Sequence, residues 1–181
     1  SSAASDVYKR QGQQSIKVLR EMFPEKIIVS DTKCADAGST VAQNSKDAGA
    51  DFMTVIDSAT IATMKSAKSI LAGIQVELYS AWNWDLAKKW REIGIDQVIY
   101  HQSRDALLAG EVWGKKDLDI VKEFIDMGFK VSVTGGLTLD TIKLFKGVPV
   151  YTFIAGRAIT GKENPAAAAR DFQDEIRKYW A

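Results

Sequence analysis

One pattern constrains the fold of this chain more than any other: short apolar strands recur directly after glycines that end helix-like segments. Glycine suits the left-handed conformation in which many helices end. The segments between are amphipathic, with Leu86, Ala87, Trp90 and Ile93 on one face. With a first apolar run at 27–29, six strands alternate with helices, which indicates βα units and a parallel sheet. The five glycine–strand pairs are Gly49 with 52–56, Gly73 with 74–78, Gly94 with 97–100, Gly128 with 129–133, and Gly147 with 150–154.

Six βα units suit either a doubly wound sheet or a (β/α)₈ barrel that is short of two units. Barrels usually need ~200 residues or more, and this chain has 181. Residues 1–11 are small and polar, without the periodicity of any element, and Asp6–Gln11 resembles the translated end of a transposon used to prepare sequencing libraries. We therefore expect a non-native or disordered leader at 1–11. Residues 12–181 are expected to form an α/β domain, a (β/α)₈ TIM barrel lacking its first two strands.

Composition excludes several classes of function. The net charge is +1 without a basic block, which argues against nucleic acid or an anionic membrane as partner. The single cysteine, Cys34, cannot form an internal disulfide, and there is no Cys/His cluster for a metal. No apolar run approaches the ~18 residues of a membrane span, and no signal peptide is visible. These features favour a cytoplasmic protein.

The richest local motif is D-x-K-x-x-D, formed by Asp31, Lys33 and Asp36 where the run at 27–29 is expected to pass into a loop. Strand alternation would point Asp31 and Lys33 to the same side. A cation held between carboxylates stays charged and can stabilise an anion that forms beside it. The alternative is an ordinary surface salt bridge at the end of a strand.

Polar residues follow the other strands as well. In a parallel barrel all these strand ends face one rim, where active sites form. The last two turns are rich in glycine, so their backbone N–H groups can approach an anion, and phosphate sites typically follow strands seven and eight. For His101 and Glu77 the alternatives are a structural histidine and a solvent-facing acid. The residues in question are Asp57, Glu77, His101, Arg104, Thr134, Gly135, Gly136, Gly156 and Arg157.

These motifs carry a resemblance to a known family. D-x-K-x-x-D followed by Ala37-Gly38, with 76–78 as Val-Glu-Leu, resembles the orotidine 5′-phosphate decarboxylase superfamily. The segments 100–105 (Tyr-His-Gln-Ser-Arg-Asp), 133–137 and 153–157 are similar to its 3-keto-L-gulonate-6-phosphate decarboxylase branch. The resemblance extends from about residue 15 to residue 180.

The resemblance implies a (β/α)₈ barrel that uses Mg²⁺ to remove CO₂ from 3-keto-L-gulonate 6-phosphate through an enediolate. It implies that Asp31 binds the metal, and that Asp36 reaches into the site of a second subunit, so that the enzyme is a homodimer. The implied catalytic residues are Lys33, Asp36, Glu77, His101 and Arg104. The implied phosphate-binding residues are Thr134, Gly135, Gly136, Gly156 and Arg157.

One departure from the family is expected to matter. Its first two strands, which carry an aspartate near the substrate and a glutamate that binds Mg²⁺, have no counterpart in this sequence. We therefore expect the chain as printed to be poorly active or inactive. Two alternatives stay open: 3-hexulose-6-phosphate synthase, which condenses formaldehyde with ribulose 5-phosphate, and a non-catalytic sugar-phosphate-binding fragment.

Overall fold

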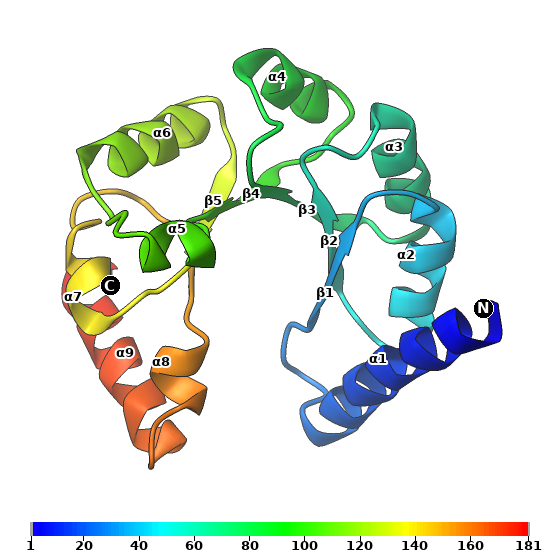
Figure 1. Cartoon of the computed structure of the whole chain (residues 1–181), viewed down its shortest axis with the longest axis horizontal. Coiled ribbons are helices and arrows are strands. Elements are labelled where there is room, and N and C mark those ends of the chain that lie inside the picture. The colour runs from blue at the N-terminus through cyan, green and yellow to red at the C-terminus, as the bar shows by residue number, and fades with distance from the viewer. Residues whose placement is uncertain (1, 181) are drawn as a thin grey trace. The chain divides into compact units, whose positions relative to one another are not determined.

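The computed structural model describes residues 2–180, with side chains from residue 12 onward. The chain divides into two compact units between Ile95 and Asp96, and Figure 1 labels their elements. Unit 1 contains α1 (Ser2–Met22), β1 (Val29–Cys34), α2 (Gly38–Asp47), β2 (Phe52–Ile56), α3 (Ile61–Ile70), β3 (Gly73–Leu78) and α4 (Trp84–Glu92). Unit 2 contains β4 (Gln97–His101), α5 (Arg104–Leu108), α6 (Lys115–Asp126), β5 (Lys130–Thr134), α7 (Leu139–Lys143), β6 (Thr152–Ile154), α8 (Arg157–Thr160) and α9 (Pro165–Trp180).

In unit 1 the strands lie in the order β1-β2-β3, and each adjacent pair is parallel. The register places Val55 opposite Val76 and Ile56 opposite Glu77. Helices α2 and α3 pack against each other beside these strands (Figure 1). Such parallel strands need helical crossovers, and the buried apolar side chains of both element types form the core of the unit. Its fully buried residues include Met53, Val55, Met64, Val76 and Trp90.

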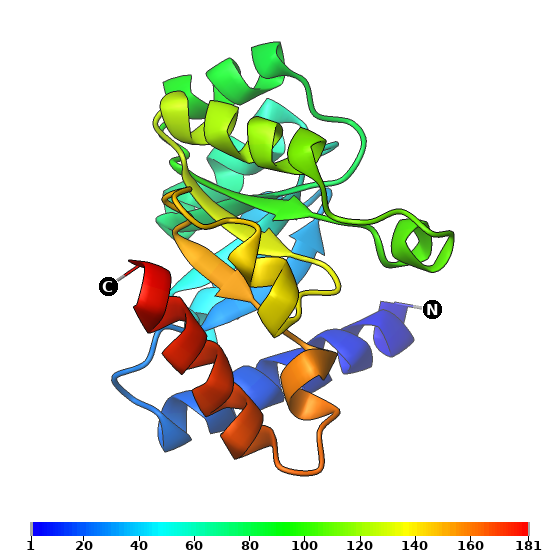
Figure 2. The same ribbon diagram turned by 90° about the vertical axis from the view of Figure 1, so that its left-hand side faces the viewer.

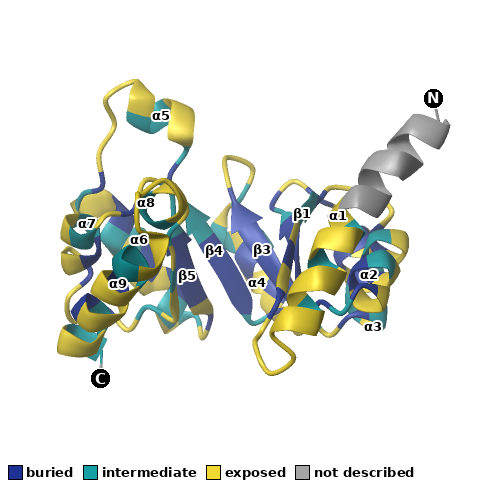
Figure 3. Ribbon diagram, turned by 90° about the horizontal axis from the view of Figure 1, so that it is seen from below, coloured by how far each residue is buried: buried dark blue, intermediate teal, exposed yellow. Residues whose placement is uncertain are grey.

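Unit 2 repeats the plan, with β4-β5-β6 in parallel order. The register sets His101 opposite Thr134, and Thr134 opposite Ile154, so the polar ends of these strands are neighbours. Helix α9 packs against α7 and α8, and Figure 2 shows α8 and α9 side by side. In Figure 3 the strands are mostly buried, while α5 stands out from the rest of the unit on an exposed loop. The core includes Val121, Phe124, Val131, Ile142 and Phe145.

The glycine pattern is confirmed at four of its five positions. Gly49, Gly94, Gly128 and Gly147 all have positive φ angles at the ends of helical segments. Gly73 differs, since α3 ends at Ile70 and Gly73 is the first residue of β3. A Cβ atom there would lie 2.4 Å from the carbonyl oxygen of Asp51, so close packing between neighbouring strands requires the glycine.

The first strand and the first helix differ from their predicted bounds. β1 starts at Val29, and Ile27 is 68% exposed, so Asp31 and Lys33 lie within the strand and not in a loop after it. The apolar run at 27–29 predicted a strand that ends too early, because only Ile28 of its three side chains is buried. Helix α1 starts at Ser2, although the sequence shows no helical periodicity before residue 13. That residues 1–11 are a non-native leader stays a prediction.

None of the described helices combines the length and apolar content needed to cross a bilayer.

Candidate active site

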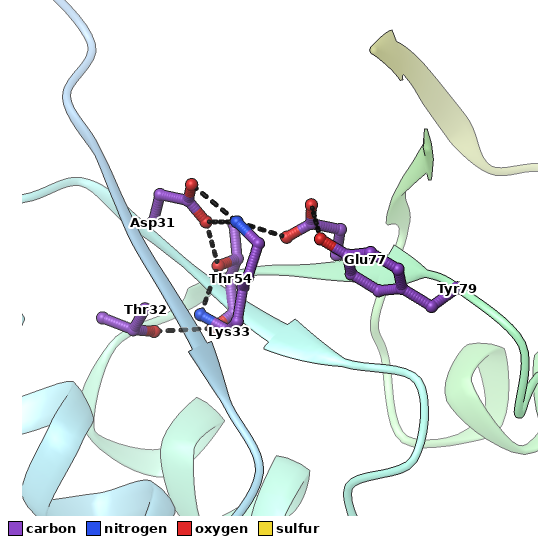
Figure 4. Close-up of polar contacts among 6 residues, drawn as sticks. All are labelled: Asp31, Thr32, Lys33, Thr54, Glu77 and Tyr79. Carbon is purple, nitrogen blue, oxygen red and sulfur yellow. Dashed lines mark hydrogen bonds and ion pairs between the residues drawn. The ribbon is translucent and has the colours of Figure 1, made fainter. Parts of the chain in front are cut away.

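Lys33 lies between two carboxylates in unit 1. Its Nζ atom donates to both oxygens of Asp31, at 2.7 Å each, and lies 3.2 Å from Oε2 of Glu77. The contact with Glu77 is an ion pair without hydrogen-bond alignment. Figure 4 shows the ammonium group between the two acids. The predicted pairing of Asp31 with Lys33 is therefore observed, and Glu77 joins it from β3.

A bulge in β1 sets this geometry. The pairing with β2 passes from Ser30 opposite Met53 to Cys34 opposite Val55, so β1 has two extra residues there. Lys33 adopts a positive φ of 43°, which is uncommon outside glycine. Bulges often re-aim side chains beside active sites. Asp31 and Lys33 thus meet through a local distortion, where the sequence had suggested simple alternation.

Thr54 of β2 fixes the bulge, and the sequence analysis missed it. Its Oγ1 accepts the backbone N–H of Lys33 at 2.9 Å and donates to Oδ1 of Asp31 at 3.1 Å. The hydroxyl of Thr32 donates to the carbonyl of Thr54 at 2.7 Å. A threonine in mid-strand offered no signal in the sequence, because these contacts depend on which strand becomes the neighbour of β1.

The carboxylates keep Lys33 charged. Partial burial lowers its pKa, but the hydrogen bond to Asp31 and the charges of Glu77 and Asp31 more than offset this, so the pKa lies above its ordinary value. The side chain of Glu77 is only 4% exposed, while those of Lys33 and Asp31 are 38% and 64% exposed. A buried acid distinguishes this arrangement from a surface salt bridge, and also from the solvent-facing alternative for Glu77.

Tyr79 supports Glu77 from the other side. Its hydroxyl donates to Oε1 of Glu77 at 3.0 Å (Figure 4). Burial and the neighbouring charge of Glu77 raise the pKa of Tyr79 to about 12, so the phenol is protonated at neutral pH and remains a donor. Residues i and i+2 of a strand share a side, so this contact could have been predicted. We call Asp31, Lys33, Thr54, Glu77 and Tyr79 the lysine cluster.

Two other acids of unit 1 do not enter the lysine cluster. Asp57 is buried, and its Oδ2 accepts the backbone N–H groups of Tyr79, Ala81 and Trp82 at 2.9, 3.0 and 3.1 Å. Asp57, one of the polar residues expected at the rim, therefore has a structural role: it fixes the loop after β3. Asp36 is exposed, and its carboxylate makes no ion pair with the side chains that the structure describes.

The predicted residues of unit 2 line one cavity of about 1230 Å³. It lies at the carboxyl ends of β4, β5 and β6, and α9 contributes Asp171 and Phe172, which the sequence analysis did not include. We call this cavity the glycine pocket. The predicted residues that line it are His101, Arg104, Thr134, Gly135, Gly136, Gly156 and Arg157.

Two cations in the glycine pocket lack acidic partners. Among the side chains that the structure describes, neither the guanidinium of Arg104 nor that of Arg157 forms an ion pair or a hydrogen bond. Arginine is well suited to planar, bidentate recognition of phosphate. The glycine pocket can therefore bind an anion without displacing a carboxylate first.

Close packing of the backbone accounts for the glycine at position 135 better than ligand binding does. Gly135 has a φ of +105°, and a Cβ atom there would lie 2.1 Å from the carbonyl oxygen of Gln102. The turn is held by the indole N–H of Trp113, which donates to the carbonyl of Gly135 at 2.8 Å, and by the N–H of Gln102, which donates to Thr134. At Gly156, in contrast, a Cβ atom would meet nothing within 4 Å.

The residues described supply an incomplete set of metal ligands. No group of three or more His, Cys, Asp or Glu residues in that part of the chain could hold a metal ion. Two carboxylates of the lysine cluster face one ammonium, however, and Asp31 is largely exposed. Mg²⁺ commonly binds one or two carboxylates and completes its shell with water and substrate oxygens. Asp31 fits the role of such a single protein ligand.

Comparison with known proteins identifies relatives along nearly the whole chain. UlaD of Salmonella paratyphi B, a 3-keto-L-gulonate-6-phosphate decarboxylase, is 45% identical over 174 residues, which are 94% of this chain and 81% of the relative. KGPDC from Streptococcus mutans, solved as a ligand complex, matches with 61% identity and a TM-score of 0.92, covering 93% of this chain and 81% of that one. The 3-keto-L-gulonate-6-phosphate decarboxylase of Vibrio cholerae matches with 40% identity and a TM-score of 0.84, covering 93% and 80%.

These matches confirm the predicted fold class, with six of the strands of a (β/α)₈ barrel in this chain. A 3-hexulose-6-phosphate synthase matches more distantly, with 27% identity and a TM-score of 0.81 over 90% of this chain and 80% of that one. Residues 4–172 match the Orotidine 5'-phosphate decarboxylase / HUMPS family. The chain belongs to this family.

Proposed function

We propose that this chain, a carboxy-lyase by family, catalyses the Mg²⁺-dependent decarboxylation of 3-keto-L-gulonate 6-phosphate to L-xylulose 5-phosphate. The names of its relatives from Salmonella and Vibrio support this choice of substrate. Loss of CO₂ from a β-keto acid leaves an electron pair that becomes an enediolate. The site must therefore stabilise an anion next to the broken bond and then protonate it.

The observation that carries the proposal is the position of Lys33 between Asp31 and Glu77. The two carboxylates hold the ammonium charged and in place before substrate arrives. A preorganised cation stabilises a developing anion without reorganising solvent. Lys33 is thus the residue that stabilises the enediolate, and Glu77 orients it.

Mg²⁺ would be held by Asp31. When bound, the ion would supply Lewis acidity to the oxygens of the substrate. Lys33 donates to both oxygens of Asp31, so one of these oxygens would have to exchange the lysine for the metal ion. Lys33 would stay in place through its ion pair with Glu77. The described residues offer only one exposed carboxylate here, in line with the expectation that the chain as printed turns over slowly.

The glycine pocket would bind the phosphate and deliver the proton. Arg157 and the backbone of Gly136 and Gly156 suit a phosphate, whose binding energy helps to position the reacting end. Thr134 and Gly135 complete the wall of the same cavity. His101 and Arg104 line it as well and would protonate the enediolate, directly or through water.

We also propose a cytoplasmic homodimer in which Asp36 acts in the partner's site. The exposure of Asp36 supports this, because its carboxylate is available to a second subunit. The single cysteine, buried in unit 1, is compatible with a reducing compartment.

The test is release of CO₂ from 3-keto-L-gulonate 6-phosphate by two proteins: the chain as printed and the chain extended at its N-terminus from source DNA. Formaldehyde with ribulose 5-phosphate serves as the second substrate pair. We expect Mg²⁺-dependent release by the extended protein and slow turnover by the printed chain. No release from a folded, Mg²⁺-loaded extended protein would refute the decarboxylase. Condensation of formaldehyde would then favour the synthase, and phosphate binding without turnover would favour a binding protein.

A further inference from the structure

The hydrogen bond between Tyr79 and Glu77 plays no part in the proposed function as stated so far. Tyr79 lies one residue beyond β3, on the same side of the chain as Glu77, and its hydroxyl donates to Oε1 of that acid at 3.0 Å. The other oxygen, Oε2, is the one that faces Nζ of Lys33 at 3.2 Å. The phenol and the ammonium thus bind opposite oxygens of one buried carboxylate, as Figure 4 shows.

The backbone of Tyr79 is itself fixed. Oδ2 of the buried Asp57 accepts its N–H at 2.9 Å, together with two further N–H groups of the same loop. A carboxylate that accepts three backbone donors is a rigid anchor, since each contact is a charge-assisted hydrogen bond. Asp57 therefore fixes the backbone from which the side chain of Tyr79 reaches Glu77.

This arrangement matters because Lys33 has a choice of partners. Asp31 binds its ammonium with two hydrogen bonds of 2.7 Å, whereas Glu77 offers a longer ion pair. The last side-chain torsion of a glutamate is soft, so each contact to its oxygens restricts the rotation of the carboxylate. Loss of the phenol removes a donor from Oε1, so the carboxylate can turn more easily and its contact with Lys33 should lengthen.

We propose that Tyr79 is a positioning residue that locks the carboxylate of Glu77 against Lys33. It acts through Glu77 and need not touch the substrate. The effect on turnover rests on the proposed function, because it assumes that Lys33 stabilises the enediolate. The effect on geometry does not depend on that assumption.

The kinetic test is Tyr79→Phe in the extended protein, with Tyr100→Phe as the matched control. Tyr100 also donates its hydroxyl to a buried carboxylate, Oδ1 of Asp117 at 2.7 Å, but that acid caps α6 and lies outside the lysine cluster. Loss of one hydrogen bond to a charged group predicts a fall in kcat of roughly tenfold for Tyr79→Phe, with KM nearly unchanged. Tyr100→Phe should lower Tm and leave kcat unchanged.

A double-mutant cycle separates positioning from a general structural role. In a Glu77→Gln background Tyr79→Phe should have little further effect on kcat, because the group that it positions has already lost its charge. Equal falls in kcat with and without Glu77, or wild-type kcat in Tyr79→Phe, would overturn the proposal.

The two proposals fail in different ways. Absence of CO₂ release from the wild-type extended protein would overturn the function and leave the geometry of Tyr79 to be decided. A crystal structure of Tyr79→Phe decides it: we expect the distance from Nζ of Lys33 to the carboxylate of Glu77 to increase. An unchanged distance would overturn the positioning role.

Discussion

The lysine cluster and the glycine pocket differ in how their cations are paired. In the lysine cluster the one cation is already bound by two carboxylates, one of them buried. In the glycine pocket Arg104 and Arg157 form no ion pair with the side chains that the structure describes. An ammonium that is already paired with carboxylates keeps its charge, whereas an unpaired guanidinium is ready to bind an anion. The difference supports the proposed division, in which the lysine cluster stabilises the enediolate while the glycine pocket binds the phosphate and delivers the proton.

Removal of Mg²⁺ should give the largest effect, and it should change turnover without changing phosphate binding. With EDTA we expect kcat of the extended protein to fall roughly 10²–10⁴-fold, because Lewis acidity contributes several kcal/mol to such reactions. The affinity of the glycine pocket for inorganic phosphate, measured by calorimetry, should be unchanged. A parallel loss of phosphate affinity would show that the lysine cluster and the glycine pocket do not have separate roles.

Lys33→Ala should have the next largest effect. Loss of a preorganised charge predicts a fall in kcat of roughly 10²–10³-fold. KM should change little, because the phosphate contacts lie elsewhere. Lys88→Ala is the control, since Lys88 forms an exposed pair with Asp85 outside both regions. A rise in KM without a fall in kcat would show that Lys33 binds substrate and does not stabilise the enediolate.

Arg157→Ala should act on binding. We expect KM to rise roughly 10- to 100-fold, the value of one or two charged hydrogen bonds to phosphate, with a smaller change in kcat. Arg170→Ala, on α9 but not among the residues that line the cavity, is the control. If Arg157→Ala lowered kcat and left KM unchanged, the assignment of capture to the glycine pocket would be wrong.

Two glycine variants should distinguish a structural glycine of the pocket from one that is available to a ligand. Gly135→Ala should lower the free energy of unfolding by roughly 1–3 kcal/mol, because of its positive φ and the contact with the Gln102 carbonyl. Gly156→Ala should leave Tm unchanged, since its Cβ would meet open space, and raise KM modestly. Thermal unfolding of both variants tests this, and equal losses of Tm would contradict it.

Sequence reasoning succeeded where the signal is local. Glycines at helix ends and the apolar runs near them predicted the six strands, and the ends of β4, β5 and β6 supplied residues that share one cavity. It failed at β1, because an apolar run predicts burial and Ile27 is exposed. It also grouped Asp57 with the candidate residues at the rim, because the sequence does not show whether a polar side chain after a strand faces a substrate or the backbone.

The sequence by itself determined the order of the βα units, the neighbours Asp31 and Lys33, and the glycine turns of unit 2, because each depends on residues a few positions apart. Only the tertiary structure decided the rest. Thr54 reaches Asp31 across 23 positions, Asp57 binds Tyr79 across 22, and Trp113 binds Gly135 across 22. Such contacts form only when particular strands become neighbours in a fixed register. No local pattern encodes that register, so the supporting residues of the site emerge only with the fold.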